Sequence, residues 1–124
     1  MDKLESIREL LTQIDMPQKQ RSDICILTLL AMADIRQDSS WRNATNNWLR
    51  IHDIITFAAE KYNAVYAENS RETFRKQAIH PFRTAALIED NGLATNSPNY
   101  RYRLTTEFLK VIREIPDNPS GATE

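Results

Sequence analysis

The scarcity of glycine is the feature of this sequence that most restricts its fold. Only Gly92 and Gly121 occur among the 124 residues. Tight turns between β-strands usually place glycine at positions of positive φ, so a chain with two glycines is not expected to consist mainly of hairpins. Two isolated glycines also cannot form a glycine-rich phosphate-binding loop. The sequence therefore favours a mainly helical fold.

The composition is typical of one globular domain that needs no disulfide bonds or other cross-links. The apolar share is 41% and the net charge is −1, which excludes a generally basic, histone-like protein. The single cysteine, Cys25, excludes a disulfide framework and a thiolate-rich zinc site. No apolar run reaches the roughly 18 residues that a membrane span needs, and a reducing cytoplasm is the expected compartment.

Three segments of the first half show helical spacing of apolar residues. Residues 3–14 and 50–62 place charged positions between apolar ones, as amphipathic helices do. Residues 18–34 are apolar on nearly all sides, which predicts a central core helix with Cys25 as a small buried hydrophobe. Residues 35–49 are rich in Ser, Asn and Asp, which is typical of an ordered loop.

A further long helix is expected at about residues 70–86. Asn69 and Glu72 match the capping-box pattern at its start. Pro81 falls inside this helix, removes one backbone donor and clashes with the preceding turn. The helix is therefore expected either to kink there or to end near Ile79.

The last part of the chain predicts a small β-hairpin and a closing helix. Residues 87–105 contain two strand-like segments around a turn-rich loop, which predicts the hairpin. A short helix is expected at residues 108–115, and residues 116–124 read as a linker or disordered tail. The order of elements predicts one winged helix-turn-helix domain at residues 1–115.

The helix at residues 70–86 has an apolar and a polar side. At about 100° per residue, one side gathers apolar residues, namely Phe74, Ala78, Phe82 and Ala85. The other side carries groups suited to base edges and phosphates, namely Thr73, Lys76, Gln77 and His80. Residues 69–103 hold six basic and three acidic side chains, a local surplus of +3. In a winged helix the second helix of the pair enters the major groove, so this pattern favours DNA binding.

Several stretches of the chain resemble one protein family. These are LTLLAMADIRQDSSW, ATNNWLRIHDII, YAENSRETFRKQAIHPF and TNSPNYRYRL, which together cover about residues 26–104. They resemble the N-terminal domain of the BsuBI/PstI restriction endonuclease family, most specifically in YAENSRETFRKQ and TNSP; proline at position 81 departs from the family pattern. The resemblance implies a winged-helix domain that helps an endonuclease read a short palindromic site, while a separate C-terminal PD-(D/E)XK domain binds a divalent metal and cuts.

The resemblance also implies particular DNA-binding residues. On the matching positions, the groove-facing set would be Asn69, Ser70, Arg71, Thr73, Lys76 and Gln77. The wing contacts would be Asn96, Ser97, Asn99 and Arg101. The analysis of the helix faces adds His80, as a contact to a phosphate.

No catalytic or metal site is expected in this chain. None of its five lysines is preceded two positions earlier by Asp or Glu, as a PD-(D/E)XK site would require. The two histidines, His52 and His80, are too few for a typical zinc site. The chain is therefore expected not to be an enzyme by itself and to need no cofactor. Mg²⁺ is expected only in the separate nuclease domain.

Two hypotheses for the function remain open at this point. The first is the sequence-reading domain of a type II restriction endonuclease. Its expected partners are double-stranded DNA, the nuclease domain of the same enzyme and, as a further expectation, a second copy in a homodimer. The second is a protein-interaction module with residues 3–34 as a dimer seam. A docking surface should show a large apolar patch, and the polar side of the helix at residues 70–86 therefore favours DNA. No membrane partner is expected.

Overall fold

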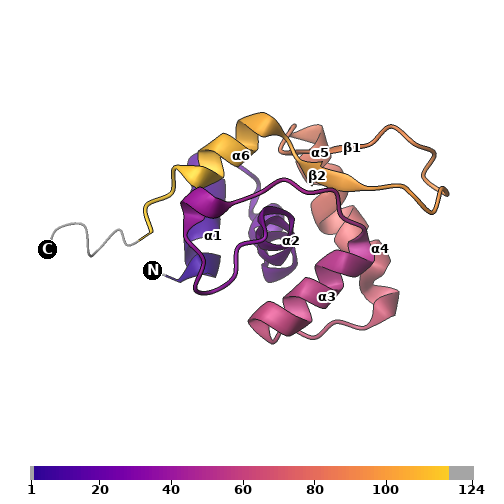
Figure 1. Ribbon diagram of the computed structural model, residues 1–124, viewed down its shortest axis with the longest axis horizontal. Coiled ribbons are helices and arrows are strands. Elements are labelled where there is room, and N and C mark those ends of the chain that lie inside the picture. Colours follow the sequence, from indigo (N-terminus) through magenta and orange to yellow (C-terminus); the bar gives the residue numbers. More distant parts are fainter. Residues whose placement is uncertain (1, 118–124) are drawn as a thin grey trace, which may run out of the picture.

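The computed structural model describes residues 2–117 and is built around one central helix. α2 (Asp23–Ala33) lies in the middle, and α1 (Lys3–Gln13) and α3 (Ile51–Tyr62) pack against it (Figure 1). Every residue of α2 from Cys25 to Ala33 is buried, so almost no side of the helix faces solvent. The predictions of a mainly helical fold and of a central core helix are confirmed.

The structure divides the segment that was expected to form one helix at residues 18–34. η1 (Gln18–Arg21) is a short 3-10 turn, and its first bond runs from the Gln20 N–H to the Pro17 carbonyl at 2.9 Å. Ser22 then adopts an extended conformation with φ −74° and ψ 164°, after which α2 begins. The apolar pattern locates the core helix correctly but does not predict the break at Ser22.

The long helix expected at residues 70–86 runs from Arg71 to Thr84 and is called helix 71–84 below. It consists of α4 (Arg71–Phe74), a π-helical turn η4 (Arg75–Ile79) and α5 (His80–Thr84). The helix does not end near Ile79: the π-turn ends directly before α5, Pro81 stands in the first turn of α5, and the chain stays helical to Thr84. Ala85, expected on the apolar side, is exposed because it lies at the C-cap.

The predicted capping box at the start of this helix is wrong. Asn69 lies within a preceding 3-10 turn, η3 (Glu68–Ser70), and no side chain caps α4. The Glu72 carboxylate instead forms an ion pair with the Arg75 guanidinium, at 2.6 Å. A charged partner one turn along the helix competes successfully with the backbone N–H for this carboxylate.

The predicted hairpin is present and has a short third partner. β1 (Ile88–Asp90) and β2 (Tyr102–Leu104) pair antiparallel. On the other edge of β2, Leu49 exchanges two backbone hydrogen bonds with Tyr102, at 2.8 and 2.9 Å. This bridge connects the segment between α2 and α3, which also contains η2 (Trp41–Asn43), to the hairpin.

The remaining elements complete a winged helix-turn-helix. The loop of residues 91–101 between β1 and β2, called the wing below, projects away from the helical core on the side opposite α1 (Figure 1). α6 (Thr106–Arg113) follows β2 directly, and the Thr105 hydroxyl caps it by accepting from the Phe108 N–H at 3.3 Å. Of the expected tail at residues 116–124, residues 118–124 lie outside the described part of the chain.

A small polar network connects the wing to helix 71–84. The Asp90 carboxylate accepts hydrogen bonds from the Gly92 N–H at 2.8 Å and the Tyr100 hydroxyl at 3.1 Å. The Arg83 guanidinium lies 2.7 Å from the same carboxylate and donates to the Tyr100 hydroxyl at 3.2 Å. Gly92 has φ +78°, a conformation that other residues rarely adopt. The network therefore fixes the base of the wing against the helix.

Replacement of Phe74 by alanine is expected to destabilise the domain strongly. The Phe74 ring is fully buried and contacts Tyr66 edge to face, with ring centroids 5.2 Å apart. Loss of the ring leaves a cavity beneath helix 71–84, and the free energy of unfolding should fall by about 3–5 kcal/mol in urea denaturation. Val65→Ala, at a position that is 81% exposed, is the matched control and should change it by less than about 0.5 kcal/mol. Equal effects of the two substitutions would contradict the packing described here.

The Asp90 network predicts a specific acid titration. The Gly92 N–H, helped by Tyr100 and Arg83, lowers the pKa of Asp90 below its ordinary value. The network's contribution to stability is therefore fully present above the unfolded pKa of about 3.9 and is lost as the pH falls through the lower folded pKa. An NMR titration of the Gly92 amide should show a midpoint below about 3.9. Tyr100→Phe should raise this midpoint; a midpoint that does not respond would show that the network does not hold the carboxylate.

Candidate nucleic-acid interface

The solvent-facing side of helix 71–84 is polar. Lys76, Gln77 and His80 are exposed, and Thr73 is half-buried. The opposite side is fully buried in the core and consists of Phe74, Ala78, Ile79 and Phe82. Burial of these apolar side chains is what directs the polar ones outward, so the helix presents a row of hydrogen-bonding groups to solvent.

A groove of about 450 Å³ lies between this helix and the wing. Its walls come from three separate segments: the start of α3, the first turns of helix 71–84, and the wing with the start of β2. Four arginines line it, namely Arg50, Arg71, Arg75 and Arg101. Glu72 is the one acidic residue of the lining, so the groove is strongly positive although the chain as a whole is not.

Two of the four arginines are held by carboxylates. Arg50 pairs with Asp53 at 2.9 Å, and Arg75 pairs with Glu72 at 2.6 Å. Hydrogen bonds from these guanidinium groups lower the pKa of both carboxyl groups, so both pairs stay ionised at neutral pH.

The other two arginines of the groove are free of carboxylates. Arg71 and Arg101 form no ion pair among residues 2–117. Arg101 donates only to the backbone carbonyls of Pro98 and Tyr100, at 2.8 and 3.0 Å. These two guanidinium groups are therefore the ones available to an anion that enters the groove.

The residues that the sequence predicts to bind DNA lie partly in the lining of the groove and partly on the wing and helix 71–84 outside it. Arg71, Ser97 and Arg101 line the groove. Asn96 and Asn99 are exposed on the wing outside the groove lining, and the Asn99 carbonyl accepts from the Asn91 side chain at 2.7 Å. The remaining expected residues lie along helix 71–84 or the turn before it, namely Asn69, Ser70, Thr73, Lys76, Gln77 and His80.

Arg50 and Arg75 are groove residues that the sequence analysis did not single out. Arg75 lies four positions after Arg71 and so shares its side of the helix, and this spacing could have identified Arg75 from the sequence. Arg50 lies far from both in sequence. It reaches the groove because the adjacent Leu49 pairs with Tyr102, and a bridge of one residue leaves no periodic pattern to detect.

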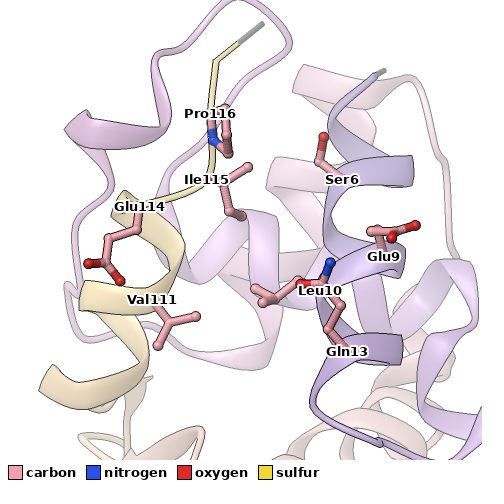
Figure 2. A pocket seen from close by; sticks show the side chains of 8 residues that line it. All are labelled: Ser6, Glu9, Leu10, Gln13, Val111, Glu114, Ile115 and Pro116. Carbon is pink, nitrogen blue, oxygen red and sulfur yellow. The ribbon is translucent and has the colours of Figure 1, made fainter. Parts of the chain in front are cut away.

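A second hollow, of about 400 Å³, lies between α1 and α6 and has a different chemistry. Figure 2 shows Leu10 and Val111 on its two sides, with the Glu114 carboxylate turned away from α1. The lining contains Glu9 and Glu114 and no basic side chain. This hollow therefore does not suit a phosphate, in contrast to the arginine-lined groove.

Neither a metal centre nor a membrane segment is found in the described residues. Within residues 2–117, no three His, Cys, Asp or Glu side chains come together in a way that could hold a metal ion. His52 instead pairs with Glu68, with Nδ1 and Oε1 2.6 Å apart. None of the helices in the same range is long and apolar enough to cross a membrane.

Comparison with known proteins gives consistent matches. The family model described as "BsuBI/PstI restriction endonuclease HTH domain" matches residues 1–120. The type II restriction enzyme BsuBI of Bacillus subtilis is 31% identical over 109 residues, which cover 85% of this chain and 34% of that enzyme. The type II restriction enzyme AplI of Arthrospira platensis is 29% identical over 111 residues, covering 87% of this chain and 34% of that enzyme.

A solved structure has the same fold. The SdaI restriction endonuclease superimposes with a TM-score of 0.84 at 26% sequence identity, over 96% of this chain and 39% of that chain. The chain thus spans between 34% and 39% of the length of these three proteins. The match over residues 1–120 confirms the resemblance found in the sequence: the chain belongs to the BsuBI/PstI restriction endonuclease family, as its helix-turn-helix domain.

Proposed function

We propose that this chain binds double-stranded DNA and reads its sequence, as the specificity domain of a type II restriction endonuclease. The observation that carries the proposal is that one helix carries both the exposed side chains of Lys76, Gln77 and His80 and, in its first turns, two arginines of the groove beside the wing. The exposed groups of the helix can reach base edges in the major groove, while the free guanidinium groups can hold backbone phosphates. The similarity to restriction enzymes supports the same conclusion.

In this proposal the polar side of helix 71–84 and the groove beside the wing have different tasks. Base reading falls to Thr73, Lys76 and Gln77, together with Asn69 and Ser70 at the start of the helix, while His80 contacts a phosphate. Phosphate contacts fall to Arg71, Arg101 and, from the wing, Asn96, Ser97 and Asn99. Arg50 and Arg75 line the same groove but are paired with Asp53 and Glu72, so they are not assigned to the phosphate set. Cleavage belongs to a nuclease domain outside these 124 residues, and the assembly works in the cytoplasm, where Cys25 stays reduced.

The alternative, a protein-interaction module, has less support. Large exposed hydrophobic residues are scattered over the described residues as Ile14, Trp48, Val65, Leu93 and Val111, and none lies on helix 71–84. A docking helix would present a contiguous apolar patch instead. A homodimer on a palindromic site stays a prediction, which sedimentation of the protein–DNA complex would test.

Affinity for duplex DNA is expected to depend strongly on salt. If four to six phosphates are contacted, the logarithm of the association constant should fall linearly with the logarithm of salt concentration, with a slope of about −4 to −5. Fluorescence anisotropy with short duplexes across a salt series measures this slope. Binding that does not respond to salt, or no binding to any duplex at low salt, would refute the proposal.

The two parts of the interface are expected to respond differently to substitution. Gln77→Ala should relax base choice at one position, because a bidentate amide–adenine pair provides about 1–3 kcal/mol of discrimination. Arg101→Ala should weaken all duplexes by a similar factor and make the salt slope less steep by about 1. Lys110→Ala, which removes an exposed charge on α6, is the control and should do neither. A common loss on all sequences for Gln77→Ala would show that Gln77 contacts only phosphate.

The isolated chain is expected to cut no DNA in the presence of Mg²⁺ or Mn²⁺. Metal-assisted hydrolysis needs converging carboxylates, and residues 2–117 contain no such cluster. A plasmid cleavage assay followed by sequencing of any ends tests this. Cleavage at a defined sequence that disappears when a single acidic residue of this chain is replaced would contradict the prediction.

A further inference from the structure

Pro81 leaves one backbone carbonyl of helix 71–84 without its usual partner. Hydrogen bonds reach back five positions in the π-turn and four positions after it, so the N–H of residue 81 would serve the carbonyl of Lys76 or Gln77, and proline has no N–H to give. The contact on the core side of the Gln77 carbonyl is partly buried, so leaving this oxygen unpaired would be destabilising. The helix nevertheless continues to Thr84, and donors from outside the helix reach the Gln77 carbonyl.

Two side chains from the N-terminal part of the chain occupy this position. The Cys25 thiol, on α2, lies with Sγ 3.1 Å from the Gln77 carbonyl oxygen. The Gln20 amide, on η1, donates to the same oxygen at 3.3 Å. Ser22 donates in turn to Cys25 Sγ at 3.4 Å, which orients the thiol. Both contacts join a proposed base-reading residue to elements more than 50 positions away in sequence.

The chemistry of Cys25 suits a hydrogen-bond donor. Its side chain is fully buried, and burial raises the pKa of the thiol, so it keeps its proton at neutral pH. A protonated thiol can donate to the carbonyl, whereas a thiolate could only repel it. The buried cysteine therefore has a specific contact in addition to filling space.

The carbonyl that these donors hold lies within the π-turn. The His80 N–H bonds to the carbonyl of Arg75, five positions earlier, where an α-helix would use four. One additional residue in a turn rotates the rest of a helix by about 100° relative to an uninterrupted α-helix. The π-turn therefore determines the directions in which Gln77 and His80 project relative to Arg71.

We propose that Cys25 and Gln20 are positioning residues for DNA reading: by holding the Gln77 carbonyl within the π-turn, they fix this turn and the direction of the reading side chains. This inference rests on the proposed DNA-reading function. It assigns a role in base selectivity to two residues that contact no DNA.

The test compares base selectivity among four variants and the wild-type chain. Selectivity is the ratio of two affinities, one for the preferred duplex and one for a duplex that differs from it at a single base pair. That base pair is the position at which the Gln77→Ala variant no longer distinguishes between bases. Cys25→Ala and Gln20→Ala should each lower this ratio, and Cys25→Ala should lower it about fivefold or more. Cys25→Ser, which keeps a donor, should recover most of the ratio.

A matched control separates positioning from simple loss of packing. Thr28 is fully buried on α2, and its hydroxyl donates to the Ile24 carbonyl of its own helix at 2.8 Å. Thr28→Val should lower stability without changing the ratio.

Hydrogen exchange of the His80 amide gives a second readout that needs no DNA. Cys25→Ala should accelerate this exchange about tenfold more than Thr28→Val does if the thiol holds the π-turn. The inference would be overturned if the wild-type chain selects a sequence while Cys25→Ala and Gln20→Ala leave both the selectivity ratio and the exchange rate of the His80 amide unchanged. Equal loss of selectivity in Cys25→Ala and Thr28→Val would also overturn it. A wild-type chain that binds no duplex would instead refute the proposed function.

Discussion

The enclosure of α2 is the constraint on which the rest of the structure depends. A helix that is buried from Cys25 to Ala33 needs a neighbour on each side, and α1, α3 and helix 71–84 provide them. Helix 71–84 contributes its own apolar side to this contact, and only its polar side remains for solvent. The position of the candidate interface is thus a consequence of how the core closes, because the residues that could read DNA are those that the core excludes.

Much of this fold can be predicted from the sequence, because helices leave a periodic signal. The apolar spacing locates α1 and α3 to within about one residue, and the alternation around Tyr102 locates the hairpin. The signal fails where a local contact decides the outcome. Ser22 lies in the polar stretch of residues 18–23, where no apolar spacing marks the break before α2, and Glu72 pairs with Arg75 although its spacing from Asn69 matches a cap. Both outcomes depend on energies of about 1 kcal/mol, which a pattern cannot rank.

The candidate site, like the fold, can be predicted from the sequence only in part. The polar side of helix 71–84 follows from residue spacing, since Lys76, Gln77 and His80 lie opposite Phe74 and Phe82. The groove does not follow from spacing, because Arg50 and Arg101 meet only through the bridge between Leu49 and Tyr102. Pro81 shows the limit most clearly. The sequence predicts a conflict at this position, and its resolution by side chains of α2 and η1 is visible only in three dimensions.

The distribution of charge explains how a chain with net charge −1 can present a surface suited to DNA. Its basic surplus is confined to residues 69–103, and Arg50 adds to the same groove from outside this segment. Asp53, outside the groove lining, and Glu72, within it, neutralise two of the four guanidinium groups and hold them in fixed directions. A uniformly basic surface would bind any duplex through its phosphates, with little dependence on sequence. Under the proposed function, the presence among the described residues of only two free guanidinium groups in the groove, Arg71 and Arg101, leaves a larger share of the binding energy to contacts that depend on base identity.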